Sequence, residues 1–242
     1  MIITLCIPCV DIHIPLLLKL LSSINNFTRK PDKIMIGLSP KFNDYDLFDE
    51  KKKILQLYPQ LPIDIIVQTT KTNAAQHLNI MGKVVKEGFI IRADADDVIH
   101  PQKLEIIESL VKKYPDTKLI LHRCRVLTDK RDYTSKHFKL YENINFDDTL
   151  YTDVKYGNKG YDLISEDFSK KYNRAYDFLA RSNWIVNGAN SYHHSVFHDV
   201  VYENRSFAED AIFNRDVTIK YEKTIFLDEK LVDILGSGTW RN

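Results

Sequence analysis

Short apolar segments alternate with amphipathic helices through the first half of the chain, and this alternation constrains the fold more than any other feature. Five apolar segments are predicted as strands, at 2–8, 33–38, 63–67, 89–93 and 118–127. Four amphipathic helices are predicted between them, at 14–21, 47–58, 74–86 and 101–113. Strands and helices that alternate at this spacing pack as a mostly parallel central sheet flanked by helices. We therefore predict an α/β fold that binds its ligand beyond the carboxyl ends of the strands.

The second half of the chain is less regular. From Thr128 to about Arg181 the sequence is polar and rich in Tyr, Asp and Asn, so we expect an irregular lobe of long loops and short elements. Regular structure is predicted again as an apolar segment at 184–186, helices at 195–200 and 209–221, and strands at 224–227 and 231–234. No linker rich in Gly, Pro or Ser separates the halves, and we interpret residues 1–242 as a single domain.

Three carboxylates follow the fourth predicted strand within four residues. The apolar run 89–91 leads directly to Asp94, Asp96 and Asp97. Negative charge at the end of a buried strand is costly unless a cation neutralises it. Because side chains alternate along a strand, Asp94 and Asp96 are expected to share a face, where two carboxylates suit Mg²⁺ completed by substrate phosphate. The cluster predicts a metal and diphosphate site, and the alternative is an acidic turn that caps the helix after Pro101.

The composition excludes several classes of partner. Lys and Arg number 34 against 33 Asp and Glu, a net charge of +1, so no global basic field favours a nucleic-acid partner. No apolar run approaches the roughly 20 residues that a membrane span needs, and the first residues lack the features of a signal peptide. Three cysteines are too few for a secreted disulfide framework, so we expect a cytoplasmic protein without a transmembrane segment.

Four segments in a fixed order carry a resemblance to a known family. They are Ile7-Pro8 at the end of a strand, Ala74-Ala75-Gln76-His77-Leu78 in a helix, Asp94-Ala95-Asp96-Asp97 after a strand, and Glu209-Asp210 opening a helix. This order resembles the inverting family 2 glycosyltransferases, which belong to the nucleotide-diphospho-sugar transferase superfamily and have the Rossmann-like GT-A fold. The chain departs from the family pattern at Val10-Asp11, at 37–40 and at Gln76-His77, where the family usually has Tyr-Asn, Asp-Asp-Gly-Ser and Arg-Asn.

The resemblance implies a metal-dependent transfer of a sugar from a UDP-, GDP- or dTDP-sugar to a hydroxyl of a glycan, a lipid-linked glycan or a protein glycan. Residues 1–127 would form the nucleotide-sugar-binding half of the GT-A domain and 128–242 the acceptor-binding half. The resemblance assigns donor binding to Pro8, Ser39, Gln76, Asp94 and Asp96.

The resemblance also assigns the metal and the chemistry. Asp94 and Asp96 would hold Mn²⁺ or Mg²⁺, Asp210 would be the general base, and Glu209 would orient it. A sugar hydroxyl is a poor nucleophile, so a positioned carboxylate is what an inverting displacement needs. The alternative for Glu209 and Asp210 is plain charge in the first turn of a helix. Arg92 is interpreted as a charge partner of the acidic cluster rather than as a substrate group.

Two other functions stay open at this point. The Cys-Ile-Pro-Cys segment from Cys6 to Cys9 lies between a predicted strand and helix, as in thiol oxidoreductases. A catalytically silent sugar-binding module is the second alternative, favoured if the weak match at Gln76-His77 reflects decay of the motif.

Overall fold

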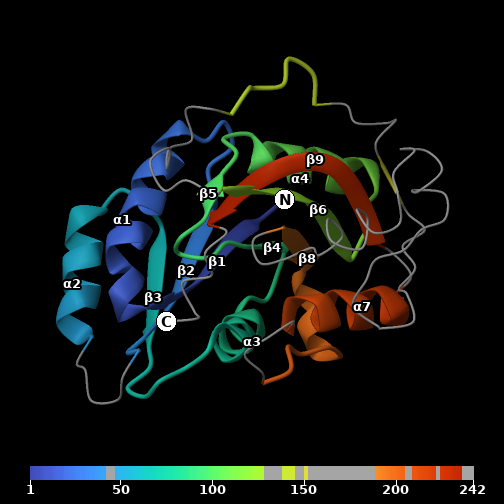
Figure 1. Ribbon diagram of the computed structural model, residues 1–242. Helices are drawn as coiled ribbons and strands as arrows, with labels where there is room; N and C mark the ends of the chain where they lie inside the picture. Colours follow the sequence, from blue (N-terminus) through green and yellow to red (C-terminus); the bar gives the residue numbers. More distant parts are fainter. Residues whose placement is uncertain are drawn as a thin grey trace.

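The computed structural model describes residues 1–41, 47–127, 138–144, 150–151, 189–204, 209–221 and 224–235, and its centre is a curled β-sheet (Figure 1). In this part of the chain the sheet has nine strands. Their order across the sheet is β3 (Ile63–Val67), β2 (Lys33–Ser39), β1 (Ile3–Val10), β4 (Phe89–Arg92), β8 (Asn190–His193), β6 (Leu119–Leu127), β9 (Thr224–Leu235) and β5 (Val98–Ile99). The remaining strand, β7 (Leu150–Tyr151), pairs with β9.

Most of these strands run in the same direction. The first four in the order, from β3 to β4, are parallel neighbours. Strand β8 runs antiparallel between β4 and β6, so β6 and its parallel neighbour β9 again run in the sense of β4. The mostly parallel sheet predicted from the sequence is therefore confirmed, and the carboxyl ends of β1, β2 and β4 meet at one edge.

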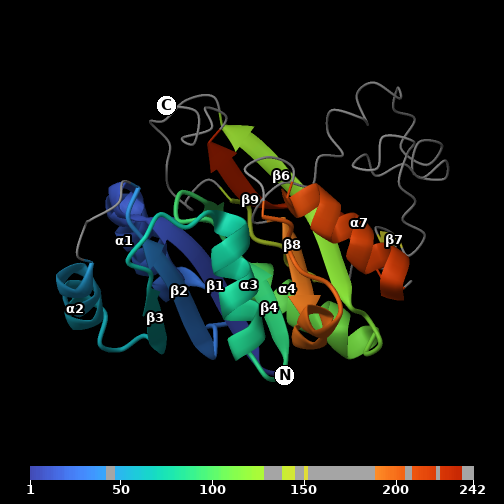
Figure 2. The same ribbon diagram turned by 90° about the horizontal axis from the view of Figure 1, so that it is seen from below.

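Helices cover both faces of the sheet, each over its own apolar layer (Figures 1 and 2). On one face lie α1 (Ile14–Ser23), α2 (Phe48–Leu57) and α4 (Lys103–Lys113). On the other lie α3 (Ala74–Val84), α7 (Glu209–Tyr221) and the 3-10 helix η6 (His194–His198). Two short 3-10 helices, η1 (Asp11–His13) and η2 (Ile24–Asn26), flank α1. None of the helices in the described part of the chain is long and apolar enough to cross a membrane.

The local sequence sets both the start of α3 and the turn that follows it. The Asn73 side chain accepts a hydrogen bond from the Gln76 N–H at 2.9 Å, and the Gln76 side chain accepts one from the Asn73 N–H at 3.0 Å. This reciprocal cap satisfies two donors that a helix start leaves unpaired. Before β4, Gly88 has a φ of +75°, a left-handed conformation that glycine adopts without steric cost. Helix α3 and the buried strand β4 are thereby joined through a defined turn.

Several elements differ from the sequence prediction. The strands β5 and β7 have two residues each and β8 is the polar segment Asn-Ser-Tyr-His, so no apolar pattern predicts them. The two strands predicted at 224–227 and 231–234 are one strand, β9, whose register against β6 shifts around Arg123. The helix predicted near 195–200 is the 3-10 helix η6. The predicted segment 184–186 and most of 128–181 lie outside the described residues.

Candidate active site

The acidic residues after β4 form a tight turn at the carboxyl edge of the sheet. Strand β4 ends at Arg92, and the Asp97 N–H donates to the Asp94 carbonyl over 3.0 Å. The Asp97 carboxylate accepts from the Asp94 N–H at 2.8 Å and so closes the same turn. The prediction that Asp94 and Asp96 share a strand face is therefore wrong, because neither residue lies in a strand. Asp94 and Asp97 are buried and Asp96 is half-buried, which leaves Asp96 as the more accessible carboxylate.

Arg92 joins this acidic turn to the start of α7. Its side chain is fully buried, with Nε 3.3 Å from Asp94 Oδ1 and Nη2 3.4 Å from Glu209 Oε1. Its guanidinium carbon also lies 5.6 Å from the centre of the Tyr202 ring, which stacks on Phe213 of α7 at 3.9 Å. Arg92 is thus a charge partner of the acidic cluster, as predicted. The bridge to Glu209, 117 residues away in sequence, could not be predicted from the sequence.

The charge of the turn is only partly compensated by Arg92. Burial raises the pKa of Asp94 to about 6; Arg92 opposes this shift, and the carboxylates of Asp96 and Glu209 add to it. Burial is the largest cause of this shift, and in addition the carboxylates of Asp94, Asp96 and Glu209 outnumber the single arginine among them. Such a site gains stability from a bound cation.

A buried lysine interacts electrostatically with the turn and was not predicted as a functional residue. Lys103, in the first turn of α4, has no exposed surface. Burial lowers its pKa to about 7, and the negative charges of Asp97 and Asp94 act in the opposite direction. Burial also raises the pKa of Asp97 well above its usual range, and Asp94 and Asp96 raise it further. Lys103 therefore lies close enough to Asp97 and Asp94 to offset part of their charge.

The first turn of α7 brings the second acidic pair to the same place. Glu209 and Asp210 are 9% and 5% exposed, and Asp210 acts electrostatically on Arg92. Burial raises the pKa of the Cys124 thiol on β6 to about 11, and the nearby charges of Asp97 and Asp210 raise it further. The acidic turn and the start of α7, which the sequence separates widely, therefore lie close to one another around Arg92 and Cys124.

Ser39 and His77 form a buried pair at the carboxyl end of β2. The Ser39 hydroxyl donates to the Thr72 carbonyl at 3.1 Å, so His77 Nε2, 2.9 Å from the Ser39 oxygen, must carry the proton and donate. Burial lowers the pKa of His77 to about 4, which keeps the ring neutral. The His77 ring also packs on Gly37, where a Cβ would overlap it. Ser39 lies at the predicted edge of the sheet, with its hydroxyl already hydrogen-bonded within the protein.

The other two residues assigned to donor binding lie at the same edge. Pro8 is buried near the end of β1, level with Gly37 of the neighbouring strand. The Gln76 side chain completes the cap of α3 described above. The structure thus brings Pro8, Ser39 and Gln76 to neighbouring strand and helix ends, while the side chains of Ser39 and Gln76 have structural partners.

The two cysteines of the Cys-Ile-Pro-Cys segment do not form a redox pair. They lie three residues apart within β1 and point to opposite faces, Cys6 into the layer under α3 and α7 and Cys9 into the layer under α1 and α2. Three strand residues span about 10 Å, beyond the roughly 7 Å that a disulfide can bridge. Burial raises the pKa of both thiols, that of Cys6 to about 12. The geometry therefore argues against a thiol oxidoreductase.

Replacing both thiols by alanine tests this structural role. We expect Cys6→Ala/Cys9→Ala to retain turnover within a few-fold of the parent and to lose some stability, because two small buried groups are removed. Steady-state turnover and thermal unfolding would be measured on the same preparation. A folded variant that has lost all activity would contradict this assignment.

The residues of the turn fit a hard divalent cation. Their donors are carboxylate oxygens, the ligands that Mg²⁺ and Mn²⁺ prefer, and two protein carboxylates suffice when substrate phosphate completes the shell. Within the described residues no group of three or more His, Cys, Asp or Glu side chains is arranged to hold a metal ion. A cation at this turn would therefore take ligands from outside the protein as well.

The comparisons with known proteins give structural matches alone. No family model and no curated protein matches the sequence. Residues 1–349 of TarS from S. aureus superimpose with a TM-score of 0.64 at 13% identity, covering 97% of this chain and 60% of that one. The same TarS fragment in complex with UDP-GlcNAc gives a TM-score of 0.64 at 12% identity, covering 97% of this chain and 58% of that one.

A third structure is the mannosyltransferase PcManGT from Pyrobaculum calidifontis, in complex with GDP-Man and Mn²⁺. It matches with a TM-score of 0.59 at 12% identity, over 98% of this chain and 57% of that one. The fold is that of the GT-A glycosyltransferases. At these identities the likeness concerns the fold, and the chain spans about 60% of the length of the TarS fragment.

Proposed function

We propose that this GT-A chain is a metal-dependent glycosyltransferase that takes its sugar from a nucleotide-diphosphate sugar. The observation that carries the proposal is the meeting of two acidic groups around buried Arg92, at the carboxyl edge of the sheet. The turn from Asp94 to Asp97 has the chemistry to bind a cation, and the pair Glu209 and Asp210 has the chemistry to accept a proton. A sugar transfer from a diphosphate donor needs both.

Asp94 and Asp96 would hold the cation, and residues 1–127 would bind the donor. When bound, Mn²⁺ or Mg²⁺ neutralises charge on the departing nucleotide diphosphate. Asp97 keeps the turn closed by accepting a hydrogen bond from the Asp94 N–H, and Lys103 offsets part of its charge. Pro8, Ser39 and Gln76 line the same edge, and we propose that the nucleotide lies over this part of the sheet.

Asp210 would accept the proton of the acceptor hydroxyl, which would come from the side of residues 128–242. Its position in the first turn of α7 favours the ionised carboxylate, because the helix dipole is positive there. Glu209, held by Arg92, would fix the direction of that turn. Direct displacement by the activated hydroxyl inverts the anomeric carbon, and we propose inversion on this ground. A glycan, a lipid-linked glycan or a protein glycan would be the acceptor.

A thermal-shift screen tests the donor and the metal together. UDP-, GDP- and dTDP-sugars would be added to the protein with Mn²⁺, with Mg²⁺ or with EDTA. At about 100 times its Kd, a ligand that binds only the native state adds ~2.7 kcal/mol of stability. For a chain of this size that corresponds to a Tm increase of about 5–10 °C. We expect such an increase for one nucleotide class with a divalent ion, and its loss in EDTA.

The variant Asp96→Asn is the matched control for this screen. It keeps the size of the side chain and removes the charge of the more accessible carboxylate, so the metal-dependent increase in Tm should disappear while the parent Tm without ligand remains. Equal stabilisation in EDTA would overturn the metal assignment. Donor binding without any donor hydrolysis or transfer would favour the silent sugar-binding module.

A further inference from the structure

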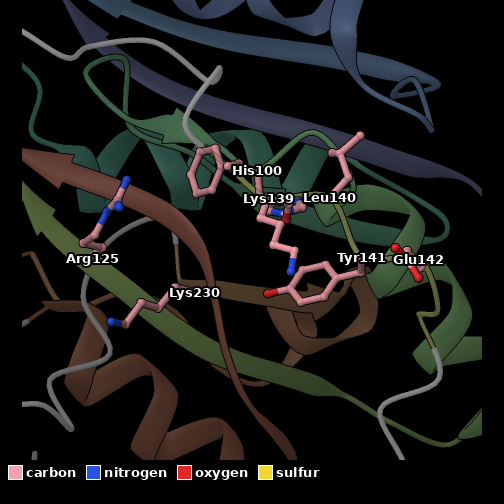
Figure 3. A pocket seen from close by; sticks show the side chains of 8 residues that line it. His100, Arg125, Lys139, Leu140, Tyr141, Glu142 and Lys230 are labelled. Carbon is pink, nitrogen blue, oxygen red and sulfur yellow. The ribbon is translucent and has the colours of Figure 1, made fainter.

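A pocket of about 600 Å³ lies beside β6 and β9, on the sheet face opposite α7 (Figure 3). Arg125 of β6 and Asp233 of β9 are paired on this face, whereas their neighbours Cys124 and Val232 point into the layer under α7. Figure 3 shows Arg125 and Lys230 on one side of the pocket and Lys139 with Tyr141 on the other. The volume lies within the range of about 300–1,000 Å³ typical of small-molecule sites.

Residues 138–142 form one wall of the pocket, and hydrogen bonds to their backbone hold them in place. His100 Nδ1 accepts from the Gln102 N–H, so the proton is on Nε2, which donates to the Lys139 carbonyl at 3.2 Å. The Gln102 side chain donates to the Tyr141 carbonyl at 3.0 Å and accepts from the Tyr141 N–H at 2.7 Å. The wall is therefore tied to the start of α4 by three hydrogen bonds to its backbone.

The charged side chains of the pocket are mostly positive. Lys139 and Lys230 have no acidic partner among the described residues. Arg125 is paired with Asp233 at 2.7 Å, yet its side chain is 41% exposed while that of Asp233 is fully buried. Among the described residues that line the pocket, Glu142 is the one acid. The exposed lysines therefore offer ammonium groups to a negatively charged ligand.

The same pocket offers apolar surface next to these charges. Leu140 is 52% exposed, and the Tyr141 hydroxyl is already taken because it donates to Glu229 at 2.7 Å. The ring of Tyr141 and the side chain of Leu140 therefore suit the apolar C–H face of a sugar rather than another polar group.

We propose that this pocket binds a saccharide carrying a phosphate or a carboxylate group. Lys139 and Lys230 would donate charge-assisted hydrogen bonds to the anionic oxygens, and Tyr141 would contact the ring. Binding at this pocket is independent of the metal turn. That the ligand is part of the acceptor rests on the proposed function.

Titrations with three related sugars test the pocket. Glucose 6-phosphate, glucuronate and glucose would be titrated by NMR in EDTA, so that no divalent ion binds at the acidic turn. We expect binding of the phosphate sugar, the carboxylate sugar or both, and much weaker binding of neutral glucose. The first two arms distinguish a phosphate from a carboxylate as the recognised group.

Charge reversal of the two lysines locates the binding. Lys139→Glu/Lys230→Glu should weaken binding of the anionic sugar about 10–100-fold. The reason is that hydrogen bonds to charged groups are stronger than those between neutral groups. The matched control is Lys19→Glu/Lys83→Glu, which makes the same change of charge at two exposed lysines of α1 and α3. It should bind within about two-fold of the parent, because screening removes most long-range effects of surface charge.

Three results would overturn the proposal: no binding by the parent, equal binding of glucose and the anionic sugars, or equal weakening in both double variants. The proposed function is tested separately by the nucleotide-sugar screen. A protein that binds the anionic sugar and is stabilised by no nucleotide sugar would keep this pocket and lose the proposed function.

Discussion

Replacing Asp210 by asparagine is expected to lower turnover by ~10²–10⁴-fold, the usual contribution of a general base. Asparagine preserves the size of the side chain and can still cap a helix start, so the fold and α7 should survive. Donor affinity should stay within a few-fold of the parent, because the residue acts on the acceptor hydroxyl rather than on the nucleotide. Initial rates at saturating donor, together with donor binding measured by thermal shift, would separate the two effects.

Asp216→Asn is the matched control, since Asp216 lies on the same helix and is paired with Arg215, with both side chains half-buried. It should retain near-parental turnover. Near-parental turnover of Asp210→Asn would show that Asp210 is a charged residue in the first turn of α7 and not the general base. The configuration of the product, determined by NMR, gives an independent test, because retention at the anomeric carbon would contradict direct displacement.

Replacing Arg92 by methionine is expected to destabilise the protein by about 3–5 kcal/mol, the usual effect of removing one partner of a buried ion pair. Asp94 and Glu209 would lose the cation between them, and Tyr202 would lose its cationic contact. The free energy of unfolding would be measured by denaturant titration at several pH values. The loss should be larger at pH 8 than at pH 5.

The sign of this pH dependence follows from the pKa of Asp94. Burial already raises it to about 6 in the folded protein, above the value of about 3.9 in an unfolded chain, and loss of Arg92 would raise it further. The folded state then binds more protons than the unfolded state, so stability falls as the pH increases through the folded pKa. At pH 5 much of the carboxyl is protonated, and less charge is left without a partner.

Two further variants make the Arg92 experiment specific. Arg29→Met removes an arginine paired with Asp32 and Glu108 near the surface, and it should cost no more than about 1 kcal/mol. Adding Glu209→Gln to Arg92→Met should recover part of the stability, because one of the two stranded carboxylates is removed. If Arg92→Met and Arg29→Met lower the free energy of unfolding equally, Arg92 contributes no more to stability than an ion-pair residue near the surface.

The regular part of the fold could be predicted because its signals are local. The five strands from β1 to β4 and β6 are apolar runs, and α1 to α4 have apolar residues at helical spacing, so their positions agree with the prediction within a few residues. The strand β8 could not be predicted in this way. Its segment is polar, and it is a strand because two neighbours, β4 and β6, supply hydrogen-bonding partners on both sides.

The candidate site was predictable in its components but not in its geometry. The acids from Asp94 to Asp97 and at Glu209-Asp210 are clear in the sequence, whereas their proximity depends on Arg92 and on the path of α7. The prediction that Asp94 and Asp96 share a strand face was wrong because the chain forms a turn there, closed by the side chain of Asp97. Lys103 gave no signal, because a lysine at a helix start is usually exposed.

The antiparallel strand β8 also has a consequence for how the chain is synthesised and folded. Strands β4 and β6 are complete once residue 127 has left the ribosome, yet the strand that pairs with both of them begins at Asn190. Until then β4 has one unpaired edge, and β6 has both edges unpaired because its other partner, β9, comes later still. Unpaired strand edges can associate with other chains. Closing the sheet joins segments about 100 residues apart, a slow step for a chain of this size. A fragment that ends before β8 would therefore leave these edges exposed permanently, and pairing both edges of β6 requires the chain as far as Leu235.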